Sequence, residues 1–421
     1  MPMLRYGQTT VSFQIPSGHT LRTVTYRLPR NPGSQLESRA RIRRALDAPI
    51  GSSPLRRLAR CKTEAVILIP DGTRLCPSPL LLEPLLEELN EAGIPDDRID
   101  VVVALGYHRR HTQEELRELV SHPVYTRVRV HNHSCLSEDC VYIGTTTLGT
   151  PVEINRLVAA SPLRIVIGNI EPHSLVGISG GVKSLVPGVA SKRCIEHNHA
   201  LSLTHKAIVG SSDNPVHRDL EEAQRLVPVH FMLNVIVDHD RHVLDAVAGD
   251  IVKAHQVGMR LAAERFLVPA SPVYDIVIAS PGGYPKDLHM YQAVKTLRNA
   301  AAFTKPGGTI ILVAECSEML GNGQFQAWLD TMHNRSHTVA QLRAHFVLGA
   351  HKILHIDEIL AHHRVYLLSA MPRPVTQLLG FTPVESLDSL LEELLSPQRP
   401  TAAACLPYGA LTFPKPASPS L

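Results

Sequence analysis

The amino-acid sequence predicts an α/β fold with two domains and largely parallel sheets. Short β-branched apolar runs alternate along the chain with stretches of helical periodicity, and this alternation is typical of parallel sheets covered by helices. A length of 421 residues is enough for two or three domains, each with its own core. The Pro-rich break at residues 267–273 separates a long helical pattern from a new apolar run, which predicts a hinge between the domains.

The individual elements are expected as follows. The apolar runs interpreted as buried strands are Ala65–Ile69, Ile99–Leu105, Arg164–Gly168, Phe231–Val237, Asp275–Ser280, Thr309–Ala314 and Val365–Ser369. The clearest helical patterns are Leu80–Ala92, Gln113–Val120, Val216–Leu226, Gly249–Phe266, Asp287–Phe303 and Ser386–Leu395. Thr112 and Glu115 have the spacing of a capping box, which predicts that a helix begins at this point.

These elements divide the chain into three parts. We expect an N-terminal α/β domain over residues 1–268 and a C-terminal α/β domain over residues 273–397. Residues 398–421 are rich in Pro, Ala and Ser, and this composition predicts a loose tail.

Composition narrows the class of protein. The net charge is only +3 and the basic residues are scattered, so nucleic acid is not expected as a partner. No apolar run reaches the roughly 18 residues of a membrane span, and the first residues lack the apolar core of a signal peptide. The seven cysteines are irregularly spaced, which favours reduced thiols and a cytoplasmic location.

Polar side chains follow one predicted strand after another. Residues 71–74 (Asp-Gly-Thr-Arg) follow the first strand, residues 106–112 the second, and residues 169–173 the third, ahead of the glycine-lysine segment 179–183. In open α/β sheets, ligands bind beyond the carboxyl ends of the strands. Each segment alone is better explained as a turn or a surface charge, but together, at successive strand ends, they predict a functional site.

The glycines beside Lys183 suggest one role for this segment. Gly180 and Gly181 can bring backbone N–H groups close to a phosphate. The segment is nevertheless no Walker loop, because the glycine directly before the lysine is missing, and no GxGxxG follows the first strand. Cys135 and Cys140 have poor spacing for zinc. A conventional nucleotide-binding fold and a structural zinc are therefore not predicted.

An ordered set of motifs runs over residues 71–295. The motifs are Asp71-Gly72-Thr73-Arg74, Gly106-Tyr107-His108-Arg109, Ile170-Glu171-Pro172-His173, Ser179-Gly180-Gly181-Val182-Lys183, Pro187-Gly188 and Tyr291-Gln292-Ala293-Val294-Lys295. Together they resemble the lactate racemase family. The resemblance covers most of the chain and is thinnest before residue 60 and after residue 330.

The resemblance implies a cofactor, the nickel-pincer nucleotide. This pyridinium-3-thioamide-5-thiocarboxylate mononucleotide holds nickel through its sulfurs and a ring carbon. By resemblance, Lys183 forms the covalent thioamide and so belongs to the metal site, and His199 completes the nickel coordination, with His197 as the alternative. The residues expected to bind the cofactor are Lys183, Asp71, Thr73, Arg74, Gly180, Gly181 and Tyr291.

The resemblance also implies a reaction, the racemisation or epimerisation of a 2-hydroxyacid by proton-coupled hydride transfer through a 2-ketoacid. His108 and His173 would be the catalytic pair, and neutral imidazole suits proton transfer because its free pKa is about 6.5. Arg74, Gln292 and Lys295 would bind the substrate. Since Gln292 and Lys295 belong to the second predicted domain, we expect the active site in the interdomain cleft.

The partners implied are a small 2-hydroxyacid, the proteins that make the cofactor and, for the assembly, a homo-oligomer. Which 2-hydroxyacid is the substrate stays open, as does the role of the segment 345–355. Two alternatives also stay open. One is a non-catalytic relative that binds nickel or the nucleotide, and the other is a different α/β oxidoreductase. An adduct on Lys183, and turnover of a 2-hydroxyacid, would separate them.

Overall fold

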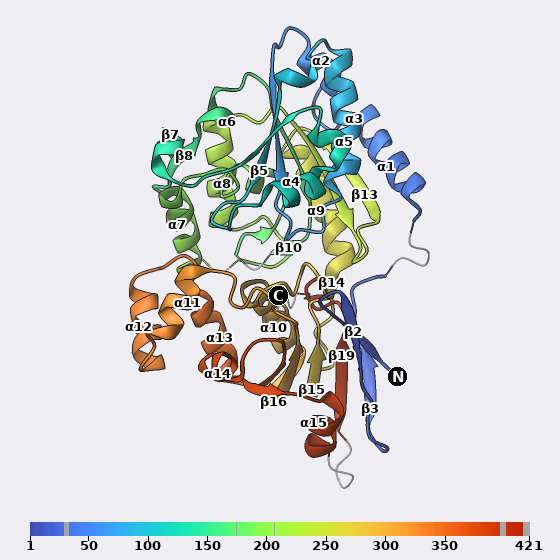
Figure 1. Cartoon of the computed structure of the whole chain (residues 1–421), viewed down its shortest axis with the longest axis vertical. Coiled ribbons are helices and arrows are strands. Elements are labelled where there is room, and N and C mark those ends of the chain that lie inside the picture. Colours follow the sequence, from blue (N-terminus) through green and yellow to red (C-terminus); the bar gives the residue numbers. More distant parts are fainter. Residues whose placement is uncertain (29–32, 174, 206, 396–400, 416–421) are drawn as a thin grey trace, which may run out of the picture. The chain divides into compact units, whose positions relative to one another are not determined.

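The computed structural model describes residues 1–28, 33–173, 175–205, 207–395 and 401–415. The chain forms two compact units (Figure 1). Residues Leu28–Arg265 form one, called the lysine unit because it contains Lys183, and Met1–Arg27 with Phe266–Leu421 form the other, called the terminal unit because it contains both ends of the chain. In the described part of the chain, no helix combines the length and the apolar character that crossing a membrane requires.

The lysine unit is built on a six-stranded sheet with the order β13-β12-β9-β4-β5-β6. Its strands are β4 (Ala65–Pro70), β5 (Ile99–Ala104), β6 (Arg129–Asn132), β9 (Arg164–Asn169), β12 (Phe231–Val237) and β13 (Val243–Gly249). All neighbours are parallel except β12 and β13. The central strands are apolar and buried along their length, as parallel strands covered on both faces must be.

Helices and smaller elements complete this unit. The helices are α1 (Gln35–Asp47), α2 (Leu55–Ala59), α3 (Ser78–Glu91), α4 (Gln113–Val120), α5 (His122–Tyr125), α6 (Arg156–Ala160), α7 (Lys192–Ala200), α8 (Pro215–Leu226) and α9 (Lys253–Phe266). Two antiparallel hairpins pair β7 (Cys140–Thr145) with β8 (Pro151–Asn155), and β10 (Pro172–His173) with β11 (Gly177–Ile178). The predicted capping box is confirmed, since the Thr112 hydroxyl accepts from Glu115 N–H and the Glu115 carboxylate accepts from Thr112 N–H.

The terminal unit is built on a parallel six-stranded sheet with the order β18-β17-β16-β15-β19-β3. Its strands are β3 (Thr20–Thr23), β15 (Tyr274–Ala279), β16 (Thr304–Val313), β17 (Arg364–Leu368), β18 (Thr382–Val384) and β19 (Ala402–Leu406). Alternate residues of β15 face two separate cores, with Val277 in one and Ile276 and Ile278 in the other. The sheet is therefore covered on both faces.

Shorter elements surround this sheet. The helices are α10 (Met290–Ala301), α11 (Gly323–Asp330), α12 (Arg335–Ala344), α13 (Lys352–Leu360), α14 (Arg373–Leu378) and α15 (Leu387–Leu394). Strands β1 (Met3–Tyr6) and β2 (Thr9–Ser12) form an antiparallel hairpin, and β14 (Leu267–Val268) pairs in parallel with β20 (Phe413–Pro414). The predicted α/β class with largely parallel sheets is thus confirmed.

The first residues of the chain belong to a different unit from the one in which they were predicted. Met1–Arg27, expected in the N-terminal domain, belong to the terminal unit. Strand β3 pairs with β19, and the N–H of Gly7 donates to the Asp287 carboxylate at 2.7 Å. The four residues of β3 are largely exposed and carry little apolar signal, so the sequence pattern gave no sign of this pairing.

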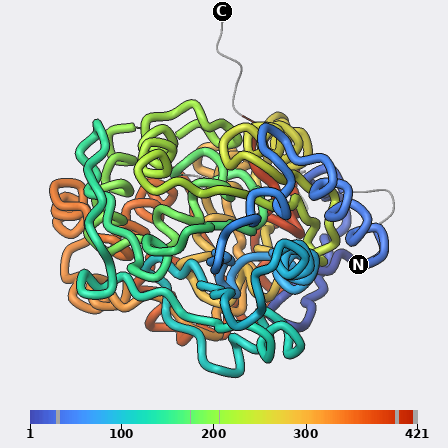
Figure 2. Tube along the Cα trace, turned by 90° about the horizontal axis from the view of Figure 1, so that it is seen from above, coloured from blue at the N-terminus to red at the C-terminus, as the bar shows by residue number. Residues whose placement is uncertain are grey.

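The prediction of a loose tail over residues 398–421 is wrong for β19. This strand lies between β15 and β3, and four of its five residues are buried. Its alanines are poor strand formers in isolation, but small side chains fit a strand that has neighbours on both sides. Figure 2 follows the same trace from a second direction, coloured from blue at the N-terminus toward red at the C-terminus. Residues 398–400 and 416–421 lie outside the described part of the chain.

The predicted hinge lies close to a change of unit. The chain passes from the lysine unit to the terminal unit between Arg265 and Phe266, just before the predicted break at residues 267–273. Each unit is described by itself below.

Candidate active site

The loops after β4, β5 and β9 carry the predicted polar residues of the lysine unit. These three strands are neighbours and run parallel, so their carboxyl ends meet at one edge of the sheet. Asp71 and Arg74 follow β4, His108 follows β5, and His173 follows β9. The structure brings them into two hydrogen-bonded pairs and one ion pair.

Asp71 and His108 form the first pair. The Asp71 carboxylate accepts from Nδ1 of His108 at 2.9 Å and from the backbone N–H of Thr73 at 2.8 Å, and the Thr73 hydroxyl also donates to it. Burial raises the pKa of the Asp71 carboxyl, but His108, Arg74 and Thr73 together hold it well below its ordinary value. Because an ionised carboxylate only accepts, the imidazole carries its hydrogen on Nδ1 and has a lone pair on Nε2.

Arg74 contacts a second carboxylate, that of Glu171. The guanidinium nitrogen Nη1 lies 3.8 Å from Glu171 Oε1, and the Asn169 amide donates to the other carboxylate oxygen at 3.3 Å. Glu171 is buried, and the side chain of Arg74 is 17% exposed. A guanidinium has five N–H groups, so this contact leaves Arg74 able to bind a further anion.

His173 and Lys183 form the second pair, with 3.0 Å between His173 Nε2 and Lys183 Nζ. The other ring nitrogen, Nδ1, accepts from the backbone N–H groups of Leu175 at 3.1 Å and Val176 at 3.4 Å. A nitrogen that accepts carries no hydrogen, so the hydrogen of the neutral ring is on Nε2. The Lys183 amine thus lies within hydrogen-bonding distance of the Nε2 side of the His173 ring.

The lysine loop is held from two sides by residues that the sequence interpretation missed. A Cβ on Gly181 would lie 2.7 Å from the His255 ring, and the Gly181 N–H already donates to Asn234 Oδ1 at 2.8 Å. A Cβ on Gly180 would also meet Asn234, at 2.8 Å. His255 Nε2 bonds the carbonyl of Ser179 at 2.8 Å. The structure thus gives Gly181 a packing role, and its N–H is not available to a phosphate.

Asn234 could have been found in the sequence, whereas His255 could not. Asn234 is an amide inside the apolar run Phe231–Val237, and a buried polar group in such a run needs a partner. His255 lies on α9 with no local signal. Burial lowers the pKa of His255 to about 4, which keeps its ring neutral near pH 7.

Helix α7 carries both candidate nickel ligands, and its contacts separate them. Thr150 donates its hydroxyl hydrogen to Asp219 at 2.7 Å, so it accepts from Nδ1 of His197 at 3.0 Å. Asn198, the residue between the histidines, donates to the same Asp219 oxygen at 2.8 Å. At about 100° per residue, His197 and His199 point to nearly opposite sides of the helix. His197 is turned toward Thr150 and His199 toward the other side of the helix, and the choice of His199 as the metal ligand stays a prediction.

Tyr291, Gln292 and Lys295 lie together on α10 of the terminal unit. Gln292 is buried and its amide oxygen accepts from Lys295 Nζ. Residues of the segment 345–355 surround Tyr291, since Lys352 Nζ lies 4.6 Å from the centre of its ring and the His351 ring packs edge-on at 6.0 Å. The structure therefore brings this segment to the predicted substrate-binding helix.

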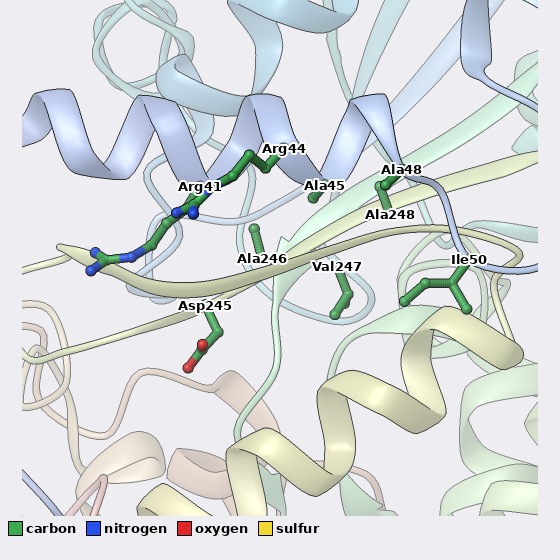
Figure 3. Close-up of a pocket in the computed structure, with 9 residues that line it drawn as sticks. All are labelled: Arg41, Arg44, Ala45, Ala48, Ile50, Asp245, Ala246, Val247 and Ala248. Carbon is green, nitrogen blue, oxygen red and sulfur yellow. The ribbon is translucent and has the colours of Figure 1, made fainter.

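A separate hollow of about 320 Å³ lies in the lysine unit, between α1 and the edge strand β13 (Figure 3). Its lining residues are Arg41, Arg44, Ala45, Ala48, Ile50, Asp245, Ala246, Val247 and Ala248. None of them is a predicted site residue, and Arg41 is already bonded to the carbonyl of Val243 at 2.6 Å. This hollow is distinct from the residues that follow β4, β5 and β9.

Histidines, carboxylates and a lysine at the ends of parallel strands are typical of an α/β enzyme, and known proteins show which kind. The family model of the lactate racemase N-terminal domain matches residues 6–210, and that of the C-terminal domain matches residues 270–397. The chain belongs to the lactate racemase family. It is an isomerase, of the racemase type.

Two curated relatives support this membership. The lactate racemase of Thermoanaerobacterium thermosaccharolyticum is 35% identical over 334 residues, which are 77% of this chain and 76% of that protein. The lactate racemase of Lactiplantibacillus plantarum is 38% identical over 296 residues, which are 69% of each protein.

Solved structures show the same fold. The lactate racemase apoprotein of T. thermosaccharolyticum matches with a TM-score of 0.85 and 28% identity, over 98% of this chain and 99% of that one. A protein of Thermotoga maritima matches with a TM-score of 0.67 over 92% of this chain. At 16% identity, this second likeness shows the fold alone.

The family implies a nickel-containing cofactor, and the residues present fit one. Lys183 offers an amine beside the His173 ring, and His199 offers an imidazole, a common ligand of nickel. Within the described ranges, no group of three or more His, Cys, Asp or Glu is arranged to hold a metal ion by itself.

Proposed function

We propose that this protein is a nickel-pincer nucleotide-dependent racemase or epimerase that acts on a 2-hydroxyacid, with lactate as the first substrate to test. The observation that carries the proposal is the contact of Lys183 with His173, because it places an amine that can form the cofactor linkage beside an imidazole that can take or give a proton. When bound, the cofactor would supply the site that accepts and returns a hydride.

His108 would take the proton of the substrate hydroxyl through Nε2. Asp71 holds the imidazole in the tautomer that has this lone pair, and the carboxylate stabilises the imidazolium that forms. Its low pKa keeps Asp71 ionised through the cycle. A positioned acid–base group of this kind contributes about 10²-fold to 10⁴-fold to the rate.

His173 would be the second member of the catalytic pair, and its ring carries its hydrogen on the other nitrogen from that of His108. It presents a hydrogen at Nε2, so it can donate to a substrate oxygen once Lys183 is acylated. To accept a proton at Nε2, the ring must release the N–H groups of Leu175 and Val176 from Nδ1. We infer that the two histidines exchange roles through a movement at His173.

The other assignments complete the proposal. Arg74, Gln292 and Lys295 would bind the substrate carboxylate, His199 would be the nickel ligand, and Asp71, Thr73, Gly180 and Tyr291 would line the cofactor site. A cytoplasmic location and dependence on the proteins that synthesise the cofactor also remain part of the proposal.

The test is an intact mass together with a nickel measurement on protein produced in cells that also make the cofactor. We expect one adduct per chain on Lys183, about one nickel per chain, and racemisation of at least one chiral 2-hydroxyacid. Lys183→Ala should lose the adduct, whereas Lys253→Ala, which removes an exposed lysine of the same unit, should keep it.

Two results would contradict the proposal. One is an adduct that persists in Lys183→Ala. The other is wild-type protein with no adduct and no nickel, from cells in which the T. thermosaccharolyticum lactate racemase is loaded normally. A loaded protein that turns over no 2-hydroxyacid would support the non-catalytic alternative.

A further inference from the structure

The loop after β5 contains a second histidine, His111, that joins three loops at the carboxyl edge of the sheet. Its ring nitrogen Nε2 accepts from the backbone N–H of Gly72 at 3.2 Å. Its backbone N–H donates to Asn132 Oδ1 at 3.0 Å, and its carbonyl accepts from Asn132 Nδ2 at 2.8 Å. Only 11% of the side chain is exposed. His111 thus connects the ends of β4, β5 and β6.

The contact with Gly72 lies inside the turn that carries Asp71. Gly72 separates Asp71 from Thr73, whose N–H donates to the Asp71 carboxylate at 2.8 Å. A Cβ added to Gly72 would lie 3.2 Å from Cε1 of His111, closer than side chains ordinarily pack. The close approach of the two loops therefore depends on a glycine at one partner and an imidazole at the other.

The second ring nitrogen is directed toward a carboxylate that is held by other groups. Nδ1 of His111 lies 3.5 Å from Glu115 Oε2. Glu115 also accepts from Arg109 at 2.7 Å and 2.9 Å and from the N–H of Thr112 at 2.7 Å. Nδ1 makes no hydrogen bond within the described part of the chain, so the bond from the Gly72 N–H to Nε2 orients the ring, with the hydrogen of the neutral imidazole on Nδ1.

We propose that His111 is a positioning residue that sets the direction of the Asp71–His108 hydrogen bond. Loops joined at one point can pivot about it, whereas loops joined at two points have a fixed orientation. The 2.9 Å bond of Asp71 to His108 is the first point, and the bond of Gly72 to His111 is the second. Hydrogen bonds weaken steeply once they bend, so the second contact preserves the tautomer of His108. The inference deepens the proposed function, on which the catalytic meaning of the pair rests.

Two variants of His111 test this inference. His111→Leu removes the acceptor and keeps an apolar group of similar size, and His111→Gln offers an amide oxygen to the Gly72 N–H. His122→Leu, at an exposed histidine of the same unit, is the matched control. The first readout is the ¹⁵N spectrum of histidine-labelled protein without cofactor, which reports the tautomer of His108. The second is kcat and KM of loaded protein.

In wild type we expect His108 to be predominantly the Nδ1–H tautomer. His111→Leu should mix the two tautomers and lower kcat by about tenfold to a hundredfold, with KM changed by less than about threefold, as for a misplaced catalytic group. His111→Gln should restore both readouts to within about threefold of wild type, and the control should match wild type.

Two outcomes overturn the inference. In one, His111→Leu leaves the His108 tautomer and kcat unchanged. In the other, His111→Gln is as impaired as His111→Leu, which would mean that the ring only fills space. If His111→Leu does not fold, Gly72→Ala disturbs the same contact from the other loop and should shift the tautomer in the same direction. The spectrum needs no cofactor, so the tautomer of His108 can be measured whether or not the protein is a racemase. A loaded protein without racemase activity would contradict the proposed function, and the spectrum would still decide this inference.

Discussion

At the scale of single residues, the two candidate catalytic histidines, His108 and His173, have opposite hydrogen-bonding states. A carboxylate holds the hydrogen of His108 on Nδ1, and two backbone N–H groups exclude hydrogen from Nδ1 of His173. One ring therefore presents a lone pair at Nε2 and the other a hydrogen. A reaction that moves a proton off and onto one oxygen needs both forms.

Replacing Asp71 by asparagine tests this arrangement. Asp71→Asn keeps the shape but can donate as well as accept, so the tautomer of His108 is no longer fixed, and we expect kcat to fall by about 10²-fold or more. Chiral analysis of the product gives the rate, and the adduct mass serves as the control for loading. An unchanged kcat in fully loaded protein would exclude His108 as the base.

The same substitution changes the dependence of stability on pH. The pKa of Asp71 in the folded protein lies well below the unfolded value of about 3.9. Its contribution to the free energy of unfolding is therefore complete above about pH 5 and is lost as the pH falls through about 4 and below. As the pH falls through that range, the free energy of unfolding of Asp71→Asn should decrease less than that of wild type, as measured by denaturant unfolding. If the two free energies of unfolding decrease equally with pH, the lowered pKa of Asp71 is contradicted.

Local order in the sequence was enough to place Asp71, His108 and Lys183 after strands or glycine turns, because each directly follows a recognisable strand or glycine turn. Their roles stay predictions. His255 and His111 were not, because their roles come from Gly181 and Gly72, which are distant in the chain. No local pattern encodes such contacts.

At the scale of elements, apolar runs flanked by turns predicted the central strands of both sheets. The prediction for Phe231–Val237 matches β12 residue for residue, and that for Arg164–Gly168 ends one residue before β9. The helix predicted from Gly249 begins instead at Lys253, because β13 extends to Gly249. Strand β13 carries the charged Asp245 among small and apolar residues, and it was missed because its pairing with β12 determines its conformation.

The position of β19 makes a prediction about the end of the chain. A protein that stops after residue 397 would lose the strand that joins β15 to β3. Since this exposes the edge of the buried strand β15 and leaves β3 without its partner, we expect little soluble protein. A protein that stops after Lys415 keeps every described strand and is the control. Equal yields of soluble, folded protein from both, measured by gel filtration and circular dichroism, would show that β19 is dispensable.

At the scale of the whole molecule, the proposed functions are divided between the units. Lys183, His199, His108 and His173 are in the lysine unit, and Gln292 and Lys295 are in the terminal unit. A fragment of residues 28–265 retains a complete six-stranded sheet. We therefore expect it to fold and to acquire the adduct on Lys183, but not to racemise a 2-hydroxyacid.

Intact mass and chiral analysis of the fragment, beside the full chain, check this expectation. Lys183→Ala in the fragment is the matched control for the adduct. A folded fragment that stays unmodified in cofactor-producing cells would mean that residues of the terminal unit are needed for attachment. A fragment that racemises would remove the assigned roles of Gln292 and Lys295.

The pairing of β3 with β19 has a consequence for how the protein is made. Strand β3 is translated before residues 28–265, and its neighbour β19 is translated after them. The lysine unit can therefore complete its sheet while the nascent chain is still growing. The sheet of the terminal unit must wait until β19 has been made. There is accordingly an interval during synthesis in which Lys183 stands in a finished fold before the rest of the protein exists.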